Sequence, residues 1–152
     1  MNYLLDTNII LIYGRDSEIS DKIEKEYNLF SEENNLAISV VTLGELNSLT
    51  RQFKFGEKRR GMLYKLVEDI FKIDINFEEI IEKYGEIDAF SQGKLENQNL
   101  NKSSRNMGKN DLWIAATASA YDLILVTTDK DFDHLESEYI QLKYIDLNEY
   151  KK

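Results

Sequence analysis

The sequence of 152 residues contains no cysteine, no proline and a single histidine, His134. Without cysteine the chain has no disulfide and no thiolate metal site, and one histidine excludes a multi-histidine zinc site within one chain. Pro- or Ser-rich linkers, an apolar run of about 18 residues and the N-terminal pattern of a signal peptide are also missing. We therefore expect a single cytoplasmic domain over residues 1–152 with a sizeable core.

Acidic residues outnumber basic ones by 28 to 19, which gives a formal net charge of −9. Taken alone, this charge argues against a nucleic acid partner, because nucleic acid is itself a polyanion. The argument fails if many acids are gathered to hold cations. The distribution of the acids along the chain therefore decides more than their sum.

Apolar patterning predicts strands that alternate with helices. Short apolar runs predict five strands, at Asn2–Leu5, Leu36–Val40, Lys72–Ile75, Leu123–Val126 and Lys143–Ile145. Periodic apolar stripes and capping residues predict helices at Thr7–Gly14, Ser17–Asn34, Thr42–Phe55, Glu57–Ile70, Phe77–Leu95, Asp111–Ala120 and Asp131–Leu135. This alternation predicts an α/β fold of three layers, α/β/α, with a parallel five-stranded sheet.

Carboxylates follow three of these strands closely. Asp6 comes directly after the first strand, Glu45 lies one turn into the helix after the second, and Asp129 follows the fourth within three residues. Because parallel strands end at the same edge of a sheet, these three acids should meet there. Asp111 opens the helix before the fourth strand and joins them if that helix begins at the same edge.

Each acid also has a purely structural explanation. Asp6 and Asp111 are favoured N-cap residues, Glu45 has the capping-box spacing to Thr42, and Asp129 suits a turn. Together, however, four carboxylates repel one another, by about 1 kcal/mol per pair at 4 Å in bulk water and roughly four times that at an effective dielectric of 20. A divalent cation would offset this repulsion. Carboxylate ligands favour Mg²⁺ or Mn²⁺, whose natural chemistry is metal-assisted attack of water on a phosphodiester.

Four segments in order carry a family resemblance: Tyr3–Asn8, Thr42–Leu46, Asn110–Ala116 and Leu125–Phe132. With them, the chain resembles the PIN-domain nucleases, and most of all the VapC-type toxins of bacterial toxin–antitoxin pairs. The resemblance implies a metal-dependent endoribonuclease, a hydrolase that cuts RNA with one or two Mg²⁺ or Mn²⁺ ions. It places the catalytic and metal-binding acids at Asp6, Glu45, Asp111 and Asp129, with support from Asn8, Thr127 and Asp131.

Basic residues that could bind RNA phosphates form two groups. The first accompanies Phe53 and Phe55, as in many single-strand binders, and the second lies in the polar segment 96–110. The groups are Arg51, Lys54, Lys58, Arg59 and Arg60, and then Lys102, Arg105 and Lys109. The alternative for each residue is an ordinary solvated face. We expect His134 at the surface or in packing rather than as a base, and Trp113 in the core.

The resemblance also implies a small antitoxin partner and a homodimer. The helices from Leu43 to Phe71 carry apolar residues that one small core cannot all bury, among them Met62 and Tyr64. A leftover apolar patch usually marks an interface. The first basic group could pair with an acidic antitoxin tail, or an antitoxin Arg or Lys could enter the acidic pocket instead.

Two non-catalytic readings compete with the nuclease. A receiver-like signalling module also gathers acids around Mg²⁺, but it requires two adjacent acids after strand one and an aspartate at the tip of strand three. Here Asp6 stands alone and Asn76 follows Ile75. The other reading is an acidic-pocket module that binds RNA or a partner without cutting.

Overall fold

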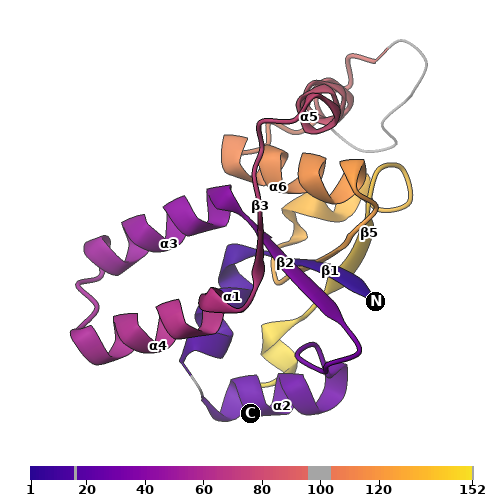
Figure 1. Cartoon of the computed structure of the whole chain (residues 1–152). Coiled ribbons are helices and arrows are strands. Elements are labelled where there is room, and N and C mark those ends of the chain that lie inside the picture. Colours follow the sequence, from indigo (N-terminus) through magenta and orange to yellow (C-terminus); the bar gives the residue numbers. More distant parts are fainter. Residues whose placement is uncertain (16, 96–103, 152) are drawn as a thin grey trace.

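A computed structural model describes residues 1–15, 17–95 and 104–151. Within these residues, five parallel strands form one sheet in the order β3-β2-β1-β4-β5 (Figure 1). The strands are β1 (Asn2–Leu5), β2 (Asn35–Ser39), β3 (Phe71–Ile73), β4 (Ile124–Thr127) and β5 (Gln141–Tyr144). Strand β1, with three of its four residues buried, lies at the centre and pairs with both β2 and β4, in agreement with its continuous apolar sequence.

Helices cover both faces of the sheet, which confirms the three-layer α/β/α prediction. They are α1 (Thr7–Gly14), α2 (Glu18–Tyr27), α3 (Val40–Gln52), α4 (Glu57–Glu68), α5 (Glu78–Ser91) and α6 (Lys109–Ala120), with 3-10 helices η1 (Lys130–Leu135) and η2 (Leu147–Glu149). Alternate residues of β1 point to opposite faces. Leu5 joins a core with residues of α1, α2, α3 and α4, whereas Leu4 joins a second core with α5 and α6.

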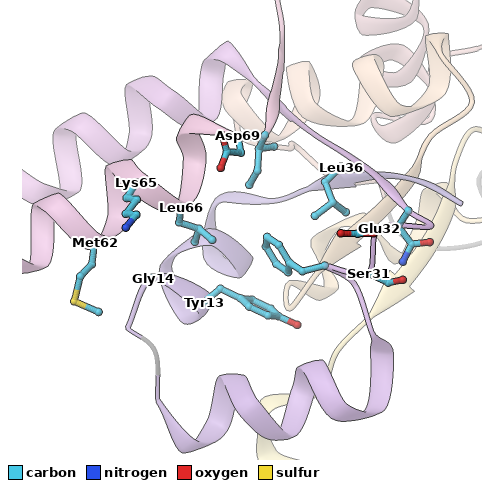
Figure 2. Close-up of a pocket in the computed structure, with 12 residues that line it drawn as sticks. Tyr13, Gly14, Ser31, Glu32, Leu36, Met62, Lys65, Leu66 and Asp69 are labelled. Atoms are coloured by element: carbon cyan, nitrogen blue, oxygen red, sulfur yellow. The ribbon is translucent and has the colours of Figure 1, made fainter.

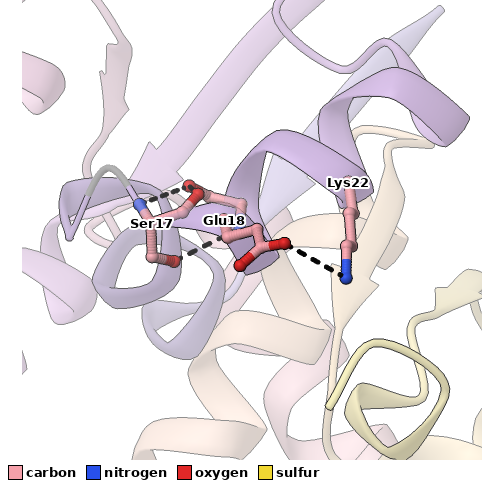
Figure 3. Close-up of polar contacts among 4 residues, drawn as sticks. Ser17, Glu18 and Lys22 are labelled. Atoms are coloured by element: carbon pink, nitrogen blue, oxygen red, sulfur yellow. Dashed lines mark hydrogen bonds and ion pairs between the residues drawn. The ribbon is translucent and has the colours of Figure 1, made fainter. Parts of the chain in front are cut away.

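The helix after Ser17 is shorter than the predicted Ser17–Asn34. Ser17 is its N-cap, as predicted, and forms a capping box with Ser20 (Figure 3). The helix ends at Tyr27 because Asn28 adopts a left-handed conformation, with φ of 51°. Figure 3 also shows the Glu18–Lys22 ion pair, at 3.7 Å, which is too exposed to contribute much stability.

Two helix starts also differ from the prediction. The N-cap of α3 is Ser39, whose Oγ accepts a hydrogen bond from the Val41 N–H at 3.1 Å, so Thr42 is not the cap. Helix α6 begins at Lys109 after the N-cap Gly108, so Asp111 lies inside the first turn. Both acids that seemed explained by capping, Glu45 and Asp111, are therefore available for another role.

Three element boundaries reflect pairing and turns that local patterning does not reveal. β3 ends at Ile73 rather than Ile75, because the Asp74 side chain accepts from the Asn76 N–H and turns the chain. β5 is Gln141–Tyr144 rather than Lys143–Ile145, since it pairs with β4 from Ile124 onward. Helix α5 spans Glu78–Ser91 rather than Phe77–Leu95.

The structure contains no helix, within the described ranges, that is long and apolar enough to cross a membrane.

Candidate functional site

The strand order creates a crevice at the carboxyl ends of β1 and β4. From β1 the chain builds outward to β2 and β3 on one side, and later to β4 and β5 on the other. In such doubly wound sheets, ligands bind where the order reverses. Asp6 lies at this point, and its N–H donates to the Val126 carbonyl of β4 at 3.0 Å.

The Asp6 carboxylate is buried, with 5% of the residue exposed, and both of its oxygens accept hydrogen bonds. Oδ2 accepts from Thr127 Oγ1 at 2.7 Å, and Oδ1 accepts from the Thr7 N–H at 2.8 Å. Burial raises the pKa of Asp6, the two hydrogen bonds oppose that rise, and the nearby charges of Glu45 and Asp129 add to it. Asp6 is also the N-cap of α1, so the structural explanation is correct as well.

Glu45 reaches the same edge from α3. Its Oε1 accepts from Thr7 Oγ1 at 2.7 Å, and the Thr7 hydroxyl lies 3.1 Å from Thr42 Oγ1. The capping-box interpretation of Glu45 is therefore wrong, because Thr42 is buried in the helix and turns its hydroxyl toward Thr7. Thr7 and Thr42 were not among the site residues predicted from the sequence, although Thr7 directly follows Asp6 and Thr42 lies three residues before Glu45.

Three further carboxylates come together beside Asp6. Oxygen atoms of Asp111, Asp129 and Asp131 all lie within 4.8 Å of one another. Asp129 caps η1 by accepting from the Asp131 N–H at 2.9 Å, and its own N–H donates to Thr127 Oγ1 at 3.0 Å. The hydroxyl of Thr127 thus connects Asp6 on β1 with Asp129 after β4.

The pKa of Asp111 shows how closely these acids are gathered. Burial, followed by the charges of Asp6, Asp129, Glu45 and Asp131 in decreasing order, raises this pKa to about 7. Helix α6 therefore begins at the same sheet edge as Asp6, a point that the sequence left open. Asp131, which the sequence placed only in support, lies within 4.8 Å of both Asp111 and Asp129, measured between carboxylate oxygens. The sequence signal for this role was the position of Asp131 two residues after Asp129.

Asn8 is exposed in the first turn of α1, and its supporting role stays a prediction. Trp113 is half-buried and packs against Tyr84 of α5, with ring centroids 4.3 Å apart, in agreement with a packing role. His134 is buried rather than at the surface, and its Nε2 lies 2.7 Å from Ser91 Oγ.

The predicted phosphate-binding residues divide into separate groups. A cavity of about 340 Å³ lies between the end of α3 and α4, lined by Asn47, Thr50, Arg51, Lys54, Phe55, Arg60 and Tyr64. Arg59 stacks instead on the Phe55 ring, 3.6 Å from its centroid, and Lys58 is exposed. Arg105 and Lys109 lie elsewhere, near the start of α6, and Lys102 is outside the described residues.

Two larger hollows lie away from the acids. One, of about 580 Å³, is bordered by Tyr13 of α1 and by Met62, Lys65 and Leu66 of α4 (Figure 2). The other, of about 860 Å³, lies at the amino ends of the strands and includes Asn2 and Phe71. Neither is lined by a residue of the acidic cluster.

The topology does not match the receiver-like alternative. In receiver domains the strand order is 2-1-3-4-5, which places the third strand beside the first. Here β3 lies at the edge of the sheet and β2 separates it from β1. Asp74 directly follows β3, where the prediction had Asn76. Because β3 is the outermost strand, the Asp74 carboxylate is separated from β1 by β2, and it accepts a hydrogen bond within a turn.

Comparisons with known proteins agree with this geometry. A family model of the PIN domain matches residues 3–138. The fold is similar to VapBC2 from Rickettsia felis bound to a DNA fragment from their promoter, with 24% identity and a TM-score of 0.71. It is also similar to VapBC-1 from nontypeable Haemophilus influenzae, with 27% identity and a TM-score of 0.65. A third similar structure is DNA-bound VapBC from Salmonella typhimurium, with 19% identity and a TM-score of 0.69.

Each of these alignments covers 95% of this chain and 98% of the other. No curated protein matches the chain. The matches confirm the resemblance expected from the sequence.

Proposed function

The chain belongs to the PIN domain family, and from this premise we propose that it is a metal-dependent endoribonuclease and the toxin of a toxin–antitoxin pair. The observation that carries the proposal is the convergence of Asp6, Glu45, Asp111 and Asp129 at the carboxyl ends of β1 and β4, with Asp131 beside them. Among the described residues, the charged groups that perturb the pKa of Asp6 and Asp111 are all carboxylates. The excess of negative charge therefore calls for a cation from outside the chain.

The donor set fits Mg²⁺ or Mn²⁺. It consists of carboxylate oxygens, the ligands that hard divalent ions prefer, and three of them approach within 4.8 Å. We propose Asp111, Asp129 and Asp131 as the residues that hold one ion, with Asp6 and Glu45 completing the site. When bound, the ion supplies Lewis-acid activation of water and stabilises charge at the phosphate.

The residues around the acids hold them in place before any ion binds. Thr127 donates to Asp6 and accepts from Asp129, while Thr7 donates its N–H to Asp6 and its hydroxyl to Glu45. Such outer hydrogen bonds orient metal ligands and raise metal affinity. We assign Thr127 and Thr7 to this role, with Asn8 as a further supporting residue.

The substrate path that we propose runs along α3. At 1.5 Å per residue, Arg51 lies about 9 Å along the helix from Glu45. The cavity at that end presents Arg51, Lys54 and Arg60 to solvent, with Phe55 and Tyr64 in its wall. Cations interleaved with aromatic rings suit single-stranded RNA, whose phosphates and bases they bind together. Arg59, stacked on Phe55, extends this surface, and Lys109, exposed at the start of α6, is a separate candidate for a phosphate contact.

The similar VapBC complexes support an antitoxin partner, and we also propose a homodimer that acts in the cytoplasm. Phe53 is 70% exposed, and Met62 and Tyr64 are exposed as well, as expected for an interface. Light scattering on the purified chain should give twice 17.8 kDa. A monomer that is harmless when expressed alone would contradict the toxin but leave the nuclease intact.

A cleavage assay tests the nuclease directly. Labelled single-stranded RNA, with DNA of the same sequence beside it, is incubated with the protein in Mg²⁺, Mn²⁺ or EDTA. We expect RNA cleavage that requires metal and falls roughly 100-fold or more in Asp6→Asn and Asp129→Asn, because several kcal/mol of transition-state stabilisation depend on the ion. Asp21→Asn, an exposed carboxylate on α2, is the matched control. Full cleavage in EDTA, or by Asp129→Asn, would disprove the metal mechanism.

A growth experiment tests the toxin. Expression of the wild-type chain alone should arrest growth, and Asp6→Asn should relieve the arrest. Sequencing of RNA ends after a short pulse of expression would then identify the target.

A further inference from the structure

A buried polar network lies behind the acidic cluster. Its centre is His134 of η1, with 6% of the residue exposed. Nε2 of His134 lies 2.7 Å from Oγ of Ser91, a fully buried residue at the end of α5, and Nδ1 lies 3.3 Å from Nη1 of Arg105. The Ser91 hydroxyl lies 3.4 Å from Met107 Sδ.

The chemistry of the four residues gives these contacts one direction. Arg105 is always a donor, so Nδ1 of His134 must accept from it. The hydrogen of the neutral ring is then on Nε2 and is donated to Ser91 Oγ, whose own hydroxyl hydrogen points to Met107. Nη1 of Arg105, both ring nitrogens of His134 and the Ser91 hydroxyl thus each have a hydrogen-bond role in the network.

The network joins the two segments that carry the acids. Arg105 and Met107 belong to the stretch that leads into α6, and therefore to Asp111. Nη1 of Arg105 also donates to the Lys130 carbonyl at 3.4 Å, and Lys130 lies between Asp129 and Asp131. The Arg105 N–H donates to the Ser91 carbonyl at 2.6 Å, which attaches the same residue to the end of α5.

We propose that Arg105 and His134 are positioning residues that fix the spacing between Asp111 on α6 and the two acids of η1. This inference rests on the metal site proposed above. It gives Arg105 a role other than the predicted binding of an RNA phosphate, because Nη1 of its guanidinium contacts the Lys130 carbonyl and Nδ1 of His134. Among the described residues, Arg105 joins the 104–108 stretch to η1 through side-chain hydrogen bonds, and Met107 belongs to the same apolar core as Phe132 and Leu135 of η1.

Two substitutions of His134 separate positioning from plain stability. In His134→Asn, the amide oxygen takes the place of Nδ1 and still accepts from Arg105, but the contact with Ser91 is lost. In His134→Gln, the longer amide reaches the place of Nε2 and keeps Ser91, but Arg105 loses its acceptor. Arg105→Met removes the donors and keeps the length of the side chain.

The experiment measures Mn²⁺ affinity by titration calorimetry and unfolding by urea in EDTA for the wild type and these variants. We expect about 10- to 100-fold weaker Mn²⁺ binding in Arg105→Met and His134→Gln, the range seen for outer-shell ligand partners. His134→Asn should bind Mn²⁺ within about threefold of the wild type, although its metal-free unfolding midpoint falls at least as far as that of His134→Gln.

Two results would overturn the proposal. If Arg105→Met and His134→Gln bind Mn²⁺ as the wild type does, the network does not position the acids. If Mn²⁺ affinity follows the unfolding midpoint across all variants, including His134→Asn, the network contributes stability alone. The metal site itself is tested by Asp129→Asn: a wild type that binds no more Mn²⁺ than this variant would refute the proposed function together with this inference.

Discussion

Replacing Asp111 with asparagine should make the metal-free protein more stable at pH 8, because it removes one charge from a crowded acidic cluster. The pKa of Asp111 is raised from 3.8 to about 7 in the folded protein, mainly by burial and then by its acidic neighbours. A group with a raised pKa binds its proton more tightly in the folded state. The stability contributed by this tighter proton binding is therefore fully present below about pH 4 and is lost as the pH rises through about 7.

The size of the effect follows from that shift. About three pKa units, at 1.36 kcal/mol each, correspond to roughly 4 kcal/mol for a fully shielded group. Asp111 is only half-buried, so solvent screening should leave about half of this, about 2 kcal/mol. Asparagine has nearly the same shape and does not titrate. Between pH 4.5 and pH 8 the variant should gain about 2 kcal/mol of unfolding free energy relative to the wild type.

Urea unfolding in EDTA, followed by the fluorescence of Trp113, measures this difference at several pH values. Asp21→Asn removes an exposed carboxylate of α2 and should leave the pH dependence unchanged. Saturating Mn²⁺ should reduce the advantage of the variant, since metal at 100 times Kd adds about 2.7 kcal/mol to the wild type and less to the variant. A difference between Asp111→Asn and the wild type that does not change with pH would show that the Asp111 carboxylate carries no electrostatic strain.

Two other predictions concern single contacts. Thr127→Val preserves the shape of the side chain but removes the hydroxyl that donates to Asp6 and accepts from the Asp129 N–H. The unfolding free energy at pH 7 should therefore fall by about 1.5–3 kcal/mol, measured by urea unfolding. Calorimetry should also show weaker binding of Mn²⁺. An unchanged urea midpoint would mean that neither carboxylate depends on it. Asn28→Ala should lower stability by about 1–2 kcal/mol in thermal unfolding, because Asn28 ends α2 at φ of 51°, whereas Asn28→Gly should be neutral or stabilising. Equal melting temperatures for the two variants would show that the left-handed backbone is not the source of the cost.

The parts of this protein that the sequence alone determined are those encoded within a few residues. The apolar run that stops at Asp6 and the run before Asp129 identified two strand ends, because strands buried on both faces are continuously apolar. Ser17 marked a helix start, since a cap acts only on its own first turn. Alternation of strands and helices was sufficient for the layers of the fold.

Which side chains meet between elements follows from the packing of the folded chain and not from the sequence pattern. The pattern Thr42-x-x-Glu45 fits a capping box equally well, and the packing of α3 against α1 turned both side chains toward Thr7 instead. Whether Asp111 lies near the other acids depends on which edge of the sheet the start of α6 faces. The packing of α6 on α5 and β4 sets this position, and the local sequence pattern does not reveal it. Arg105 resembles any exposed cation in the sequence, and its partners lie 25 residues or more further along the chain. Short-range patterns specify strands and caps, whereas contacts between distant residues exist only once the crossovers have brought the elements together.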